Sequence, residues 1–421
     1  MALRQRYGLL SIVVLATGVL TLVAEAEEVN LRSLLRVDQG ATLAELVALR
    51  SDWTIDVRIA GESKSIPASK YVHWGSYKDQ SRAAEVLLTD GTILVGEIVS
   101  IGTDSIDVAS RLWGEVHLDR RSVSASISLP PTDSRERDRQ RLHYLGSEPP
   151  DRLHLLSGDT IAGRVLPTTE RNGGGLFGLV SVGIEPENTS SNTLIQLEDL
   201  QAITFKAGTL PAARRKCLLG FDDGSLIPAI SLSLDESERV EMVTGSGALL
   251  RLSWSGFVQR LSYIQPLDNG IVYLSDLAAV SYKSLPFLTL KWPLGVDQNV
   301  LGGCLRLQGE IAFKGIGMHS SSRVAYVLDG NYRRFQAELA LDDQANRQGS
   351  VVYHVLLERP DDSDVRTWGL AFTSPIIRGG GSPVPVSVDV ASATRMALVV
   401  EMADRADTRD YANWLNARLM R

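Results

Sequence analysis

A turn pattern that recurs at a nearly constant spacing constrains the fold of this chain more than any other feature of its sequence. Three glycines, Gly91, Gly158 and Gly224, follow one another at nearly equal intervals, and each stands between short runs of apolar residues. Alternating apolar residues on both sides of an Asp-Gly or Ser-Gly turn are typical of a β-hairpin. The third copy is weaker, because Pro228 and Ala229 replace an aliphatic residue and a glycine. The spacing predicts three duplicated units.

Each unit of about 65 residues has room for roughly five short strands, and the pattern resembles small SH3-like or Sm-like barrels. A second turn glycine follows at the same distance in the first and third copies, at Gly114 and Gly247. Alternating strands at 53–59 and 70–74 precede the repeats, and we expect them to pair with the first barrel. The 36 glycines of the chain also suit a turn-rich, all-β fold.

The order of these segments predicts six parts of the chain. They are a signal peptide at 1–26, N-terminal strands with the first barrel repeat at 27–128, a linker at 129–151, the second barrel repeat at 152–210, the third at 211–283 and a β-sandwich at 284–421. The linker is flanked by prolines and contains the charge run Arg135–Arg139. For this run we expect a solvated face with one or two helical turns, and we assign it no function.

The N-terminal segment 1–26 has the order of a secretory signal peptide. Arg4 and Arg6 precede an apolar run that continues to Val23, and the small-x-small pattern Ala24–Ala26 follows. The alternative is an uncleaved anchor, but a run of about 15 residues is shorter than the roughly 20 that a membrane-spanning helix needs. We expect cleavage after this pattern, no later transmembrane segment, and a protein that is secreted, periplasmic or at the cell surface.

Charge and cysteine content exclude two classes of protein. The 43 Lys and Arg stand against 50 Asp and Glu, a formal net charge of −7, whereas binding to nucleic acid requires a basic face. The two cysteines, Cys217 and Cys304, are too few for a disulfide framework or a four-ligand zinc site. Two separate thiols and a single bridge between them both stay open.

From about residue 284 the strands become longer and more regular, with turns about every ten residues, which is typical of a β-sandwich. Several motifs follow one another there. They are Gly315–Ser320, Ser322–Gly330, Tyr332–Phe335, Leu341–Asp343, the strands from Ser350 and Pro383, and the closing run Asp410–Leu419. This series resembles the NPCBM/NEW2 domain, a carbohydrate-binding module associated with glycoside hydrolases of family 98. The resemblance implies a galactose-binding-like jelly roll and, as in some members, binding of galactose-containing glycans.

Four residues of this part are candidate ligand contacts: His319, Arg323, Asn413 and Trp414. His319 follows two glycines in a turn, where its ring can orient a sugar hydroxyl or hold the turn through backbone hydrogen bonds. Trp414 can stack on a sugar or lie buried in the closing strand. Both pairs of alternatives stay open. A shared site requires His319 and Trp414 to converge at one edge of the sandwich.

Asp342 and Asp343 stand at the end of a strand and are the candidate metal ligands. They can coordinate calcium, a hard cation that binds several oxygens, or they can cap a turn. No other cofactor is expected.

Catalytic motifs are missing from the sequence. The six histidines form no metal-spaced pair, and neither a G-x-S-x-G elbow nor a G-x-x-x-x-G-K-[ST] loop occurs. A (β/α)8 barrel needs about 250 residues of alternating strand and helix. Residues 27–283 have that length but hold short β repeats, so we expect no enzyme.

Three functions stay open, in this order. The first is an exported, non-catalytic glycan-binding protein that uses the C-terminal sandwich, with the barrels as spacers or adaptors. The second is an exported scaffold for other exported or surface proteins, whose sandwich has lost glycan binding. The third is an unrecognised polysaccharide hydrolase.

Overall fold

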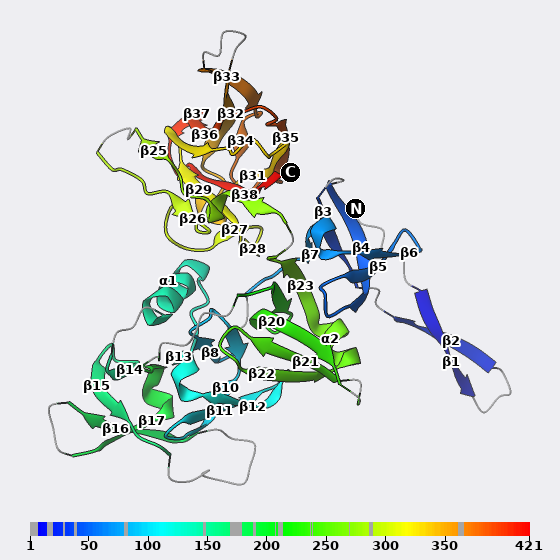
Figure 1. The fold of residues 1–421 in the computed structure, drawn as a ribbon. Coiled ribbons are helices and arrows are strands. Elements are labelled where there is room, and N and C mark those ends of the chain that lie inside the picture. The colour runs from blue at the N-terminus through cyan, green and yellow to red at the C-terminus, as the bar shows by residue number, and fades with distance from the viewer. Residues whose placement is uncertain are drawn as a thin grey trace.

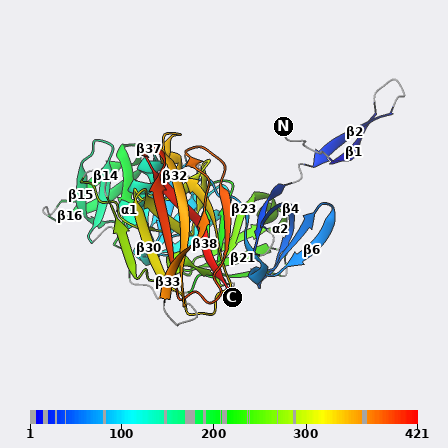
Figure 2. The same cartoon turned by 90° about the horizontal axis from the view of Figure 1, so that it is seen from above.

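The computed structural model describes all residues except 1–6, 15–19, 28–29, 38–39, 80–82, 146–148, 169–178, 188–190, 207, 209–213, 236, 238, 269, 286–288 and 361–365. Strands β1 (Tyr7–Val14) and β2 (Leu20–Glu27), of which only the backbone is described, form a separate antiparallel hairpin (Figure 2). The expected signal peptide therefore lies partly outside the described residues, and its cleavage stays a prediction.

Between residues 31 and 266 the chain builds four units with one order of elements, in which a short helix separates the last strand from the strands before it (Figure 1). The N-terminal unit contains β3 (Leu31–Arg36), β4 (Gly40–Leu49), β5 (Ile55–Ile59), β6 (Glu62–Ile66), the 3-10 helix η1 (Ala68–Lys70) and β7 (Tyr71–Gly75). The first unit contains β8 (Glu85–Leu88), β9 (Ile93–Val95), β10 (Glu97–Ile101), β11 (Ser105–Ser110), β12 (Gly114–Asp119), η2 (Arg120–Ser122) and β13 (Val123–Ile127).

The second and third units repeat this order. The second contains β14 (Asp151–Leu155), β15 (Thr160–Val165), β16 (Ser181–Pro186), β17 (Thr193–Gln196), η3 (Leu197–Asp199) and β18 (Leu200–Thr204). The third contains β19 (Cys217–Phe221), β20 (Leu226–Leu234), β21 (Arg239–Thr244), β22 (Leu249–Ser253), helix α2 (Trp254–Arg260) and β23 (Leu261–Pro266). In each of the four units the last strand pairs antiparallel with the first, as β7 with β3, β13 with β8, β18 with β14 and β23 with β19. The units are therefore barrel-like, while their resemblance to SH3-like or Sm-like barrels stays a prediction.

The turns between the first two strands of the three predicted units are the hairpins that the glycine spacing predicted. Gly91, Gly158 and Gly224 have φ values of +88°, +93° and +97°. Each glycine donates its backbone N–H to the carbonyl three residues earlier, in Leu88, Leu155 and Phe221. Glycine is required here because a Cβ disfavours these positive φ angles. The prediction of three β-hairpins at this spacing is confirmed.

The strands before residue 80 form a unit of their own, the N-terminal unit. We expected them to pair with the first barrel, but β7 pairs with β23 of the third unit, at Tyr263 with Gly75 and Ile264 with Trp74. This prediction is wrong. The reason is that the units associate in pairs through their last strands. In the same way, β13 of the first unit pairs with β18 of the second.

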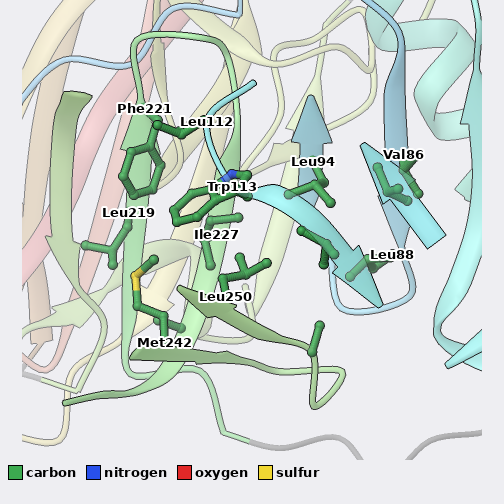
Figure 3. Packing of buried hydrophobic residues seen from close by; sticks show 14 of the residues in the cluster. Val86, Leu88, Leu94, Leu112, Trp113, Leu219, Phe221, Ile227, Met242 and Leu250 are labelled. Carbon is green, nitrogen blue, oxygen red and sulfur yellow. The ribbon is translucent and has the colours of Figure 1, made fainter. Parts of the chain in front are cut away.

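A shared hydrophobic core holds the four units together. Leu226 of the third unit pairs with Ile93 of the first. Trp113 of the first unit and Phe221 of the third meet edge to face, with 4.8 Å between ring centroids (Figure 3). The continuous cluster of buried residues around them runs from Leu34 in the N-terminal unit to Ile264 in the third. The four units thus depend on one another for burial.

Two stacked sheets form the C-terminal sandwich (Figure 1). One sheet has β24 (Val272–Tyr273), β26 (Gly295–Val296), β29 (Gly315–His319), β31 (Arg334–Leu341), β35 (Val384–Asp389) and β38 (Tyr411–Met420). The other has β25 (Ser281–Ser284), β30 (Ser322–Val327), β32 (Ser350–Pro360), β33 (Arg366–Thr373), β34 (Ile377–Arg378) and β36 (Arg395–Met402). Shorter elements are η4 (Leu274–Asp276), β27 (Leu305–Leu307), β28 (Glu310–Ala312), η5 (Asp343–Ala345) and β37 (Asp404–Asp407). A separate core from Leu274 to Leu419 lies between the sheets.

The predicted linker contains a helix of 12 residues, α1 (Ser134–Leu145). The expectation of a solvated charge run is wrong for Arg137 and Asp138, which are 4 % and 5 % exposed. The helix lies between the first unit and the sandwich (Figure 1). Its Arg141 donates to Glu85 of β8, and its Asp138 accepts from Arg306 of the sandwich. Opposite charges satisfy one another there, which is what allows burial of so polar a helix.

Six charged residues lie together at this interface, and we call them the ionic cluster. They are Asp79, Glu85, Arg137, Asp138, Arg141 and Arg306. Arg306 of β27 donates to Asp79 at 2.7 Å and to Asp138 at 2.6 Å, while Arg141 bridges Asp79 and Glu85. The arginines hold the pKa of Asp79 well below its ordinary value, against the effect of its burial.

Both cysteines are free: Cys217 is buried and Cys304 is partly buried. The alternative of a bridge between them is not realised. Within the described residues, no helix is both long and apolar enough to cross a membrane.

Candidate functional site

Three aromatic side chains from separate segments meet at one edge of the sandwich, and we call them the aromatic group: Trp292, His319 and Tyr411. His319 ends β29 and Tyr411 begins β38, where the two residues are register partners. Trp292 comes from the segment between β25 and β26, whose backbone is held by Tyr282. The Tyr282 hydroxyl donates to the carbonyls of Trp292 and Pro293 at 3.0 and 3.2 Å.

The geometry of the aromatic group fixes the Trp292 ring. It stacks on the His319 ring with 4.4 Å between centroids and 6° between planes, and it meets Tyr411 edge-on at 5.8 Å. His319 is 3 % exposed, whereas Trp292 and Tyr411 are partly exposed. A rigid, partly exposed indole beside a phenol hydroxyl can stack on the apolar face of a ligand and hydrogen-bond its rim.

The group is electrically neutral at its centre and has a carboxyl at its margin. Burial lowers the pKa of His319, which favours the uncharged ring. Asp410 precedes Tyr411, and burial raises the pKa of its carboxyl to about 6. Its Oδ1 accepts the backbone N–H of Ser350 at 2.9 Å, while Oδ2 is buried without a hydrogen-bond partner among the described residues.

Trp414 is not part of this edge. It is completely buried, edge-on to Tyr353 at 5.0 Å and beside Phe335 at 6.2 Å. The hypothesis of a shared site formed by His319 and Trp414 is therefore wrong. The physical reason is the alternation of β38: Trp414 points into the core between the sheets, where its large apolar surface is removed from water.

The other predicted contacts are also dispersed. Asn413 is fully buried and donates to Asp342 at 2.9 Å, so it supports the fold and is withdrawn as a ligand contact. Arg323 is exposed on β30 of the second sheet. Of the four candidates, only His319 belongs to the aromatic group, and it contributes from beneath Trp292.

The candidate calcium ligands are occupied by N–H donors. Asp342 is fully buried and accepts bonds from the side chains of Asn299 and Asn413 and from the backbone of Arg306 and Gln344. Asp343 accepts the backbone N–H groups of residues 308 and 309. Asp342 caps the N-terminus of η5, as the turn-capping alternative predicted. Among the described residues, no group of three or more His, Cys, Asp or Glu could hold a metal ion.

Residues 270–420 match the NPCBM/NEW2 domain family. This part of the chain is an NPCBM/NEW2 domain. The match begins before the predicted boundary at 284, because β24 and β25 already pair with β38 and β30 of the sandwich. The aromatic group lies within this NPCBM/NEW2 domain.

Individual relatives cover limited parts of the chain. A protein of Renibacterium salmoninarum, named an endo-alpha-N-acetylgalactosaminidase, is 26 % identical over 119 residues, which are 28 % of this chain and 7 % of that protein. The chain therefore spans a small fraction of the length of this relative. The CBM51 module of Clostridium perfringens GH95, solved with methyl-galactose, is 25 % identical, with a TM-score of 0.30, over 36 % of this chain and 99 % of the module. CBM51-2 and INT domains from Clostridium perfringens ZmpB, solved with GlcNAc, are 21 % identical, with a TM-score of 0.30, over 46 % of this chain and 41 % of that structure.

Sequence reasoning missed Trp292 and Tyr411 as members of the site. Trp292 stands in the short run Lys291–Pro293, where no alternation or turn motif marks it. Tyr411 lies inside the closing run that the resemblance marked, three residues before Trp414. A period-2 reading of that run puts Tyr411 and Trp414 on opposite faces of the strand, and this signal could have separated them.

Proposed function

We propose that this protein is an exported, non-catalytic glycan-binding protein whose NPCBM/NEW2 domain contacts its ligand at the aromatic group. The observation that carries this proposal is the stacking of the Trp292 ring on the buried His319 ring at 4.4 Å. A ring that is already immobilised loses little conformational entropy when a sugar stacks on it, so more of the contact energy remains for binding. Galactose-containing glycans are the first ligands to consider, because they are the ligands that the family resemblance implies.

The non-catalytic and exported parts of the proposal rest on the sequence. Catalytic motifs are missing, the strand-rich units leave no room for a (β/α)8 barrel, and segment 1–26 has the order of a signal peptide. A scaffold without glycan binding is the competing function. The two functions differ in whether the Trp292 face is used.

Binding of galactose- and N-acetylgalactosamine-containing glycans by the full chain tests this proposal. Trp292→Ala removes the stacking face and should weaken binding at least about tenfold, the equivalent of about 1.4 kcal/mol. Trp368→Ala is the matched control, because Trp368 is a tryptophan 44 % exposed on β33. It should leave the affinity unchanged.

Two outcomes would contradict the proposal. Equal binding by the natural chain and a folded Trp292→Ala variant would remove the aromatic group from the site. Release of new reducing ends when the full chain is incubated with a bound glycan would show that the protein is a hydrolase.

A further inference from the structure

A large cleft lies among three of the upstream units, away from the aromatic group. Its volume is about 1040 Å³, and its walls come from the N-terminal, first and third units. Small-molecule sites usually have volumes of roughly 300–1,000 Å³, so this cleft has room for an oligomer of several rings. Phe221 of the lining belongs to the shared core, where it packs against Trp113 and so joins the third unit to the first (Figure 3).

Two buried polar atoms on the cleft residues have no partner among the described residues. The Arg32 guanidinium lies over the Trp74 ring at 5.7 Å, forms no ion pair with any described residue, and has a buried Nε without an acceptor. Burial lowers the pKa of Arg32, which means that the charge has lost hydration without full compensation. The Ser262 hydroxyl is the second such group. Unsatisfied buried donors are costly in a native protein and call for an acceptor.

The remaining charges in the cleft divide into paired and unpaired groups. Arg260 is paired with Asp222 at 2.6 Å, and Lys78 lies 3.7 Å from Glu310. Arg111, an exposed residue of the cleft wall, forms no ion pair within the part of the chain that the structure describes. Arg32 and Arg111 are therefore the two cations available to an incoming ligand.

The acceptors and the missing aromatic surface limit the ligand further. Glu97 and Asp223 offer carboxyl oxygens in the same cleft, and Ser76 and Ser262 offer hydroxyls. The lining residues include one aromatic side chain, Phe221, and it is completely buried in the core. None of the lining residues offers an exposed ring that could stack on a ligand, so charged and hydroxyl groups must supply the specificity of this cleft.

We propose that this cleft is a second binding site, for a saccharide that carries carboxylates. Arg32 and Arg111 hold the carboxylates, because a guanidinium matches a carboxylate with two parallel hydrogen bonds. Ser262 donates to a ring oxygen or hydroxyl, and Glu97 accepts from ring hydroxyls. The site is independent of the aromatic group, so each can exist without the other.

Calorimetric titration of the full chain with trigalacturonate at low salt tests this inference. Arg111→Gln and Arg32→Gln should each weaken binding about tenfold or more, because each leaves a carboxylate without its charged donor. Arg164→Gln is the matched control, since Arg164 lies on β15 of the second unit and pairs with Glu185 outside the cleft. It should bind like the natural chain, as should Trp292→Ala. Arg111 is exposed, so its replacement leaves the core intact even if the Arg32 variant is unstable.

Titrations with two further ligands decide the ligand class. The methyl ester of trigalacturonate keeps the sugar and removes the charge, and its binding should be at least about tenfold weaker if charge-assisted bonds carry the site. Triglutamate keeps three carboxylates and removes the sugar. Equal or tighter binding of triglutamate would overturn the saccharide assignment in favour of an acidic peptide. Absence of trigalacturonate binding, or binding that Arg111→Gln and Arg32→Gln both leave unchanged, would overturn the site.

Discussion

The four upstream units bury their apolar residues jointly, whereas the sandwich buries its own. One continuous cluster runs through the N-terminal, first, second and third units, and the sandwich core forms a second cluster. Small units bury a smaller fraction of their surface and are only marginally stable alone, whereas a domain of about 150 residues buries enough to fold by itself. The repeated units are therefore interdependent, whereas the sandwich is a domain with a core of its own.

The interface between the upstream units and the sandwich is partly apolar and partly charged. Tyr77 bridges to Ile311 and packs with Tyr263 and Phe313, so part of the interface is apolar. Beside it lies the ionic cluster, in which Asp79 and Arg306 are 1 % and 3 % exposed. Removing one partner of a buried ion pair is strongly destabilising, because it leaves an uncompensated buried charge. We therefore expect the cluster to hold the sandwich, and with it the aromatic group, in one orientation relative to the upstream units.

We expect the largest loss of stability from a substitution in the shared core. Trp113→Ala removes a ring that packs against Phe221 across two units and should lower the free energy of unfolding of the upstream units by about 3–5 kcal/mol. Hydrogen exchange should show loss of protection in β8–β13 and β19–β23 together, with the sandwich unchanged. Leu194→Ala, at a leucine 65 % exposed in the second unit, is the control. Loss of protection confined to the first unit would contradict a shared core.

A substitution in the ionic cluster should cause the next largest loss of stability. Arg306→Met leaves Asp138 without its 2.6 Å partner, although Asp79 keeps Arg137 and Arg141. We expect a loss of about 3 kcal/mol, the lower end of the range for breaking a buried ion pair. Amides of α1 and β27 should exchange faster while those of β38 stay protected.

A surface pair serves as the control for the ionic cluster. Arg251→Gln breaks an exposed pair with Glu241 and should cost at most about 1 kcal/mol. Equal effects of Arg306→Met and Arg251→Gln would mean that the cluster does not hold the sandwich in place.

The sequence predicted features that depend on neighbouring residues better than features that depend on residues far apart in the chain. Gly91, Gly158 and Gly224 each act within one hairpin, so spacing alone identified the turns. The sandwich was predictable because several of its motifs follow one another in order. The ionic cluster was not, because Asp79 and Arg306 are 227 residues apart and charged residues carry no sign of their burial. The roles of Trp292 and Trp414 depend in the same way on which face packs, and only the fold decides this.

Titratable groups make the two regions respond to pH in opposite directions. His73 of the N-terminal unit is partly buried, and this burial lowers its pKa to about 4 from 6.5. Its contribution to stability is complete above pH 6.5 and is lost as the pH falls towards 4. Asp410 of the sandwich has a pKa raised by burial from 3.8 to about 6. Its contribution is complete below pH 3.8 and is lost as the pH rises through 6.

Asp410→Asn isolates the sandwich half of this contrast. The amide cannot titrate, so the natural chain should lose about 2 kcal/mol relative to the variant between about pH 4 and about pH 6. Chemical denaturation of both chains at several pH values, with hydrogen exchange in β29 and β38 as the local readout, measures the difference. Because His73 is unchanged in both chains, its opposite titration cancels in the comparison. A difference that stays constant across this pH range would mean that the Asp410 carboxyl is not protonated at the sandwich edge, and that the margin of the aromatic group is charged rather than neutral under acidic conditions.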